Sequence, residues 1–125
     1  MLTEDTDAYV SVLDDFKRRF NINPRAKKLV VGWNRLILLD APDTGSKYAL
    51  IIKDEILTDV KPMPNYDEDD EALVHLQAEQ QVLTEIFSGK YNPATALTDG
   101  VLAVFSKERD KVKLEALAMV IWRLG

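Results

Sequence analysis

Three groups of residues have types and spacings that would suit binding or catalysis: a Gly-Lys pair, a single histidine and an acidic run. The pair is Gly89-Lys90, and glycine followed by lysine ends the phosphate-binding loop of many nucleotide-binding proteins. That loop needs another glycine five positions earlier and a Ser or Thr after the lysine. This chain has Thr84 and Tyr91 there instead. The pair therefore indicates the end of a helix followed by a solvated lysine.

The single histidine is His75, so any histidine-based metal site or catalytic triad has to use it. It alternates with Val74 and Leu76, as residues on opposite faces of a strand do. No Gly-x-Ser-x-Gly turn lies nearby to supply a nucleophile. We therefore expect an ordinary strand histidine, no catalytic residue, and a protein that is not an enzyme.

The acidic run, residues 67–71, has the carboxylates of a calcium loop but not its spacing. A loop that starts at Asp67 would need glycine at its sixth position and glutamate at its twelfth. Those positions hold Ala72 and Ala78, so the run indicates a solvated loop. The chain has no cysteine, which excludes disulfides and thiolate metal sites. We expect no metal and no cofactor.

Length, hydrophobicity and charge limit the number of domains, the kinds of partner and the location of the protein. The 125 residues suit one domain, 1–125, and 46% of them are hydrophobic, enough for a core. The net charge of −5 argues against nucleic acid or anionic lipid surfaces as main partners. No apolar run approaches the roughly 20 residues of a membrane span, and the acidic start does not suit a signal peptide. We expect a cytoplasmic protein without stable membrane insertion.

The elements that would position these residues form an α+β pattern. A first helix begins near Thr3 and ends at Asn23-Pro24. Its apolar stripe consists of Val10, Leu13, Phe16 and Phe20. Five strands are expected at 36–39, 48–52, 56–60, 72–78 and 101–105. Three helices are expected near 82–87, 93–99 and from about 110 onwards.

The segment 88–106 frames a short apolar helix. Gly89 ends the preceding helix, Asn92 and Pro93 begin the short one, and Gly100 ends it. Such a helix can lie as a lid over the sheet with a gap beneath it. The final helix is apolar nearly all round, so it is either buried on two sides or presents a face to something else.

The order and the amino-acid sequence of these segments resemble those of the sterol carrier protein 2 (sterol-binding domain) family over nearly the whole chain. The resemblance rests on segments 32–39, 48–52, 55–60 and 87–90, and above all on 92–100, Asn-Pro-Ala-Thr-Ala-Leu-Thr-Asp-Gly. Two departures stand out. Asp54-Glu55 occupies a turn where the family usually has Asp-Gly, and the peroxisomal tail is absent, as in a stand-alone prokaryotic-type member.

The resemblance implies a five-stranded, largely antiparallel sheet covered by an N-terminal helix and three C-terminal helices. It also implies non-catalytic binding and transfer of a fatty acid, acyl-CoA or other lipid in an apolar tunnel between the sheet and the C-terminal helices. The expected wall of that tunnel comprises Leu83, Ile86, Phe87, Leu97, Phe105, Leu117, Ala118 and Ile121. The alternative is an interaction module with a filled core, whose apolar final helix forms a homodimer or docks on an enzyme.

Overall fold

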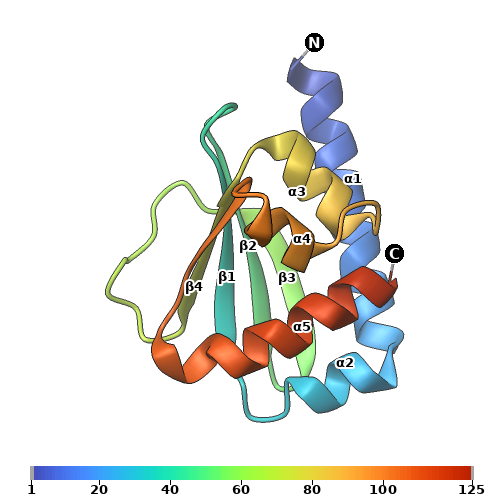
Figure 1. Cartoon of the computed structure of the whole chain (residues 1–125), viewed down its shortest axis with the longest axis vertical. Coiled ribbons are helices and arrows are strands. Elements are labelled where there is room, and N and C mark those ends of the chain that lie inside the picture. Colours follow the sequence, from blue (N-terminus) through green and yellow to red (C-terminus); the bar gives the residue numbers. More distant parts are fainter. Residues whose placement is uncertain (1, 125) are drawn as a thin grey trace.

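A computed structural model describes the backbone of residues 2–124 and the side chains of residues 8–123. It shows one five-stranded sheet with helices packed against one of its faces (Figure 1). The predicted α+β class is confirmed. None of the described helices is both long and apolar enough to cross a bilayer. The elements in chain order are α1 (Leu2–Ile22), α2 (Pro24–Leu29), β1 (Arg35–Ala41), β2 (Ser46–Lys53), β3 (Ile56–Pro62), β4 (Leu73–Ala78), α3 (Gln80–Phe87), α4 (Pro93–Thr98), β5 (Leu102–Phe105), the 3₁₀ turn η1 (Glu108–Asp110) and α5 (Lys111–Leu124).

The sheet has the strand order β3-β2-β1-β4-β5. Only β1 and β4 run parallel; the other three neighbouring pairs are antiparallel, as predicted. In this register Ile37 of β1 lies opposite both Leu50 of β2 and Val74 of β4. The three side chains belong to the buried core. The centre of the sheet thus presents a continuous apolar floor to the helices.

The first helix packs on this floor through a stripe slightly different from the predicted one. Leu13, Phe16 and Phe20 are buried as expected, but Tyr9 is buried where Val10 was predicted. The spacing from Tyr9 through Phe20 alternates four and three residues, which keeps the side chains on one face of a helix. The start predicted at Thr3 concerns a side chain outside the described ones.

A short second helix, α2, follows directly and was not predicted. We had interpreted Asn23-Pro24 only as the end of α1, and that interpretation was incomplete. The Asn23 side chain accepts hydrogen bonds from the backbone N–H groups of Arg25 and Ala26, and Pro24 occupies the first helical turn. Asparagine followed by proline ends one helix and begins the next, because proline lacks only a donor that the first turn does not use.

The hairpin between β2 and β3 contains two strained residues. Asp54 and Glu55 form a two-residue turn between Lys53 and Ile56, with φ angles of 54° and 73°. These values belong to a type I′ turn, which favours asparagine and glycine. Asn34 supports the turn, since its side-chain oxygen accepts from the Asp54 N–H at 3.1 Å.

Replacing Glu55→Gly is expected to raise the free energy of unfolding by about 1 kcal/mol. A left-handed conformation costs a residue with a Cβ roughly 1–2 kcal/mol, and the greater entropy of unfolded glycine offsets part of the gain. The measurement is urea denaturation at an unchanged m-value. Glu55→Ala is the matched control, since it removes the same charge and keeps the Cβ. Equal stability of the two variants would contradict the strain.

The short helix α4 has both of the predicted ends. Asn92 accepts a hydrogen bond from the Ala94 N–H at 3.0 Å, and Pro93 lies in the first turn. Gly89 and Gly100 have φ angles of 82° and 78°, in the left-handed region where helices often end. These caps hold α4 across the helix-covered face of the sheet (Figure 1).

Candidate ligand cavity

A cavity of about 70 Å³ lies between the sheet and the helices that cover it. Seventeen side chains line it, and all of them are hydrophobic. They come from α1, α3, α4 and α5 and from all five strands. Within the described side chains, those of residues 8–123, no polar one lines this cavity, so its wall offers an occupant apolar contact.

The structure brings six of the eight predicted wall residues to this cavity. Three lie on α3 and three on α5, and they are Leu83, Ile86, Phe87, Leu117, Ala118 and Ile121. Both helices present them because the residues recur three and four positions apart, on one helical face. Periodicity therefore places these residues on the inner faces of α3 and α5, and the family resemblance is what named them as a wall.

Leu97 and Phe105 do not line the cavity, contrary to the prediction. Leu97 lies on the outward face of α4 and is 53% exposed, whereas Ala96 is buried and Pro93 contacts the cavity. Phe105 ends β5 on the opposite face of the sheet, where its ring packs on His75 with centroids 5.5 Å apart. In both cases a shift of one residue decides which face the side chain takes.

The floor of the cavity comes from residues that the prediction left out. Phe16 and Phe20 of α1 and Ile37, Leu50 and Ile52 of the sheet all contribute to it. A signal for four of them was present, because Phe16 and Phe20 lie on the apolar stripe of the first helix and Leu50 and Ile52 alternate on one face of an apolar strand. Periodicity predicts their burial, but it does not tell a filled core from a lined space.

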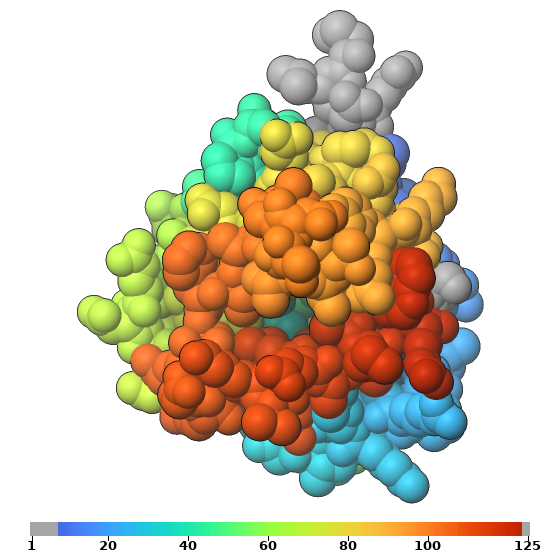
Figure 2. All heavy atoms as spheres, viewed as in Figure 1, coloured from blue at the N-terminus to red at the C-terminus, as the bar shows by residue number. Residues whose placement is uncertain are grey.

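The cavity approaches the surface between α4 and α5. Figure 2 shows a hollow between the orange segment that contains α4 and the red segment of α5, with teal atoms of the sheet visible at its bottom. Pro93 of α4 and Ala118 of α5 line the cavity from these two sides. Separation of the two helices would therefore expose its interior.

Comparison with solved structures shows which fold this is. No protein-family model and no curated protein matches the sequence. A crystal structure of sterol carrier protein 2 superposes with a TM-score of 0.67 at 16% identity, covering 91% of this chain and 92% of that one. The chain has the sterol carrier protein 2 fold.

Two further structures with this fold resemble the chain over most of both lengths. One is the ubiquinone synthesis protein UbiJ-SCP2, with a TM-score of 0.62, 12% identity and coverage of 90% of this chain and 94% of that one. The other is palmitated SCP2L2 from Aedes aegypti, with a TM-score of 0.59, 15% identity and coverage of 88% and 90%. The resemblance seen in the sequence is thus confirmed for the fold.

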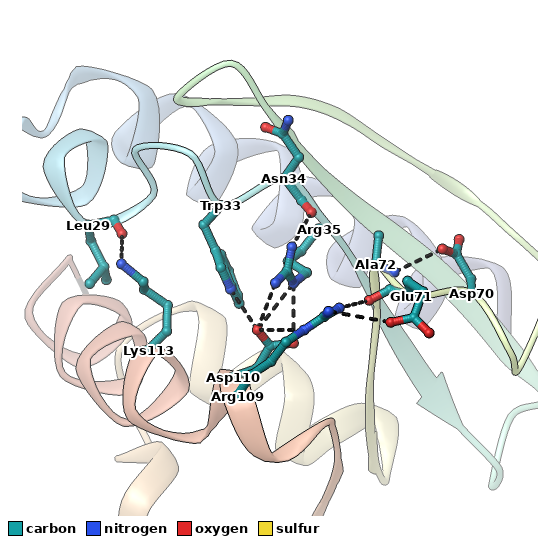
Figure 3. A network of polar contacts seen from close by, with 10 residues as sticks. All are labelled: Leu29, Trp33, Asn34, Arg35, Asp70, Glu71, Ala72, Arg109, Asp110 and Lys113. Carbon is teal, nitrogen blue, oxygen red and sulfur yellow. Dashed lines mark hydrogen bonds and ion pairs between the residues drawn. The ribbon is translucent and has the colours of Figure 1, made fainter.

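On this sterol carrier protein 2 fold, a buried polar network fixes the start of α5 (Figure 3). The Asp110 carboxylate is 1% exposed and accepts hydrogen bonds from Trp33 Nε1 and Arg35 Nη2, both at 2.9 Å. The Arg35 guanidinium also lies over the Trp33 ring, 5.3 Å from its centroid. Burial alone would raise the pKa of Asp110, but hydrogen bonds from Arg35 and Trp33 and the charge of Arg35 lower it. Asp110 is therefore ionised at neutral pH.

The polar anchoring of α5 stops after its first turn. Lys113 Nζ donates to the Leu29 carbonyl of α2 at 2.7 Å, and Arg109, just before α5, donates to the Glu71 carbonyl. Among the described side chains, none from 114 to 123 makes a hydrogen bond or ion pair with the rest of the fold. The remainder of α5 is therefore held by apolar packing, and this part faces the cavity.

His75 lies on the face of the sheet opposite the cavity. Its Nε2 is 3.0 Å from Asp40 Oδ2, and its ring packs between Tyr66 and Phe105. Among the side chains that the structure describes, no group of three or more His, Cys, Asp or Glu is placed to hold a metal ion. The alternation predicted for β4 therefore separates the histidine from the apolar cavity.

Replacing His75→Ala is expected to leave fatty-acid affinity within about threefold of the wild type. The histidine touches no part of the cavity wall, although loss of its contact with buried Asp40 should cost about 1–2 kcal/mol of stability. Titration with a fluorescent fatty acid, together with urea denaturation, measures both effects. A folded variant that no longer binds would contradict a purely structural role for His75.

Proposed function

We propose that this protein binds and transfers a hydrophobic ligand, such as a fatty acid, an acyl-CoA or another lipid, without catalysing a reaction on it. The observation that carries the proposal is the cavity wall of seventeen hydrophobic side chains beneath α4 and α5. An apolar cavity of this kind stays free of water and favours apolar guests. The sterol carrier protein 2 fold supports the proposal, since one structure with that fold is described as palmitated.

The cavity in this structure is too small for a whole lipid tail, so lipid binding requires the cavity to enlarge. An apolar cavity of about 150 Å³ accommodates benzene, so a space of about 70 Å³ admits only a small part of a lipid tail. A longer ligand has to separate α4 from α5. The part of α5 beyond Lys113 suits this movement, because its described side chains, 114–123, make no hydrogen bond or ion pair with the rest of the fold. Binding is therefore expected to be coupled to opening between the two helices.

A series of saturated fatty acids tests the proposal. Each methylene buried contributes about 0.8 kcal/mol, or about fourfold in affinity. We expect affinity to rise by this step from hexanoic acid upwards and to level off once the opened cavity is full. Competition with a fluorescent fatty acid measures the series, and native mass spectrometry of the purified protein shows any ligand retained from the host. No binding at any chain length would contradict the proposal.

The alternative function is an interaction module with a filled core. It is favoured by the outward face of α5, where Val112 and Met119 are 78% and 52% exposed. Such a module would form a homodimer or dock on an enzyme, and its apparent mass would rise with concentration while fatty acids failed to bind. Sedimentation equilibrium over a range of concentrations separates the two functions.

A further inference from the structure

Six of the sixteen basic residues of this acidic protein lie on two neighbouring helices, α2 and α5. The whole chain has a net charge of −5. The helices α2 and α5 nevertheless contain six basic residues and one acidic residue, Glu115. The basic residues are Arg25, Lys27, Lys28, Lys111, Lys113 and Arg123. Glu108, just before α5, pairs with Lys111 at 2.9 Å and offsets its charge, so the positive charge of the two helices comes from the other five. These two helices therefore form a cationic surface that the net charge conceals.

The two helices lie side by side, so their basic residues form one surface. The Lys113 ammonium donates to the Leu29 carbonyl across the contact between them. Further along, a shallow surface groove is lined by Arg25 from α2 and by Val120 and Arg123 from α5, among others. Figure 1 shows α2 packed beside α5 at the same end of the molecule.

Exposed apolar side chains lie on α5, the helix that carries three of these cations, and Glu115 lies between Val112 and Met119 on the same side of it. Val112 and Met119 are seven residues apart, two turns of α5, and both are more than half exposed. Trp122 is 38% exposed on the same helix. These three apolar residues, with the six basic residues of α2 and α5, are termed the α2–α5 face.

We propose that the α2–α5 face docks on the surface of an anionic lipid bilayer. Each lysine or arginine near an anionic bilayer strengthens binding about fivefold, equivalent to about 1 kcal/mol. Valine and methionine between the cations add apolar burial at the headgroup boundary, and tryptophan favours that boundary because its ring is both apolar and polar. The docking is peripheral.

Other occupants fit this face less well. A symmetric dimer would place the same patch of each protomer against its copy, so that the basic residues of both would face one another. A nucleic acid would satisfy the cations, but it would leave the apolar side chains between them without a partner. An anionic bilayer offers negative headgroups and hydrocarbon together. It would also lie beside the gap between α4 and α5, through which the cavity opens (Figure 2).

Sedimentation with vesicles tests the proposal on the full chain. We expect binding to vesicles of phosphatidylcholine mixed with phosphatidylglycerol, weak or no binding to phosphatidylcholine alone, and a steep loss of binding as salt is raised. Equal binding to both compositions, or binding to neither, would overturn the proposal. Concentration-dependent dimerisation that displaces vesicle binding would assign the face to a second copy instead.

Charge variants locate the contact. Arg25→Gln/Lys28→Gln removes two exposed cations and should weaken binding to the anionic vesicles about 25-fold. The matched control is Lys53→Gln/Lys61→Gln, since these lysines project from the sheet face opposite the helices. It removes the same charge and should leave binding within about twofold. Equal losses in the two double variants would show that only net charge matters and would refute the assigned face.

The apolar contribution has its own measurement. Met119→Gln should weaken vesicle binding about fivefold, the effect of burying part of a methionine side chain. Trp122 fluorescence should shift to shorter wavelength on docking and be quenched by brominated lipids, while buried Trp33 changes little. An unaltered Trp122 signal in the vesicle-bound protein would refute the orientation. Docking does not need an occupied cavity, so vesicle binding by protein that binds no fatty acid would still support the assigned face.

Discussion

Replacing Asp110→Asn is expected to lower the free energy of unfolding by about 3 kcal/mol. The substitution leaves the Arg35 guanidinium without its anionic partner, and breaking a buried pair in this way typically costs about 3–5 kcal/mol. The lower end applies here because the Arg35 side chain remains 16% exposed and keeps some hydration. Urea denaturation measures the loss, and a change below about 1 kcal/mol would show that the network does not anchor α5.

Arg18→Gln is the matched control, because Arg18 is 65% exposed and its pairing with Asp15 lies at the surface, away from the network. Exposed ion pairs contribute about 0–1 kcal/mol, so this variant should stay close to the wild type. The double variant Arg35→Met/Asp110→Leu should recover much of the loss, since it leaves no buried charge. A double variant as unstable as Asp110→Asn would indicate that shape, not charge, decides the contact.

Acid titration gives an independent readout of the same carboxylate. Folding lowers the pKa of Asp110 below its ordinary value of 3.8. Its ionised form therefore stabilises the fold fully above pH 3.8, and that contribution is lost as pH falls through the lowered pKa. The difference in stability between the wild type and Asp110→Asn should be constant near neutrality and shrink only below about pH 3.8. A difference that shrinks already between pH 7 and 5 would implicate another group.

Most of the features that were predicted correctly are determined by residues close together in the sequence, and features determined by distant residues were not predicted. The ends of α4 were predictable because Asn92, Pro93 and Gly100 act on their own backbone. The stripe on α5 was predictable because helical spacing alone places Leu117 and Ile121 on one face. The side of the sheet on which Phe105 lies was not predictable. Both faces of its strand are apolar, so which face turns toward the helices depends on what covers each face. The network of Asp110 with Trp33 and Arg35 links positions more than seventy residues apart, and no local signal marks it.

The cationic surface shows a second limit of reasoning from composition. The net charge of −5 led us to argue against anionic lipid surfaces, but that sum averages over all faces of the molecule. Acidic residues are concentrated elsewhere, including the run 67–71 in the loop that precedes β4. Only the packing of α2 beside α5 brings their basic residues into one surface. Charge patterning therefore predicts a binding surface only when the elements that carry it are placed in space.

Replacing Ala118→Phe is expected to abolish fatty-acid binding at a small cost in stability. Ala118 lines the cavity from α5 on the side that faces α4, so an added ring would occupy the space proposed for the ligand. Overfilling a close-packed core costs about 1–3 kcal/mol, and the existing space of about 70 Å³ should keep the cost near the lower end. Fluorescent fatty-acid titration and urea denaturation give the two quantities.

Ala118→Leu refines the same experiment, because its smaller side chain should fit the existing space. Filling a cavity typically stabilises a protein by about 0.5–2 kcal/mol, so this variant should gain stability while its fatty-acid affinity falls. Val112→Phe is the control on the exposed side of the same helix and should change neither quantity. If both Ala118 variants lose more than about 3 kcal/mol, the region is closely packed. The interaction module would then be the better function for this fold, because an apolar wall without usable space cannot carry a lipid.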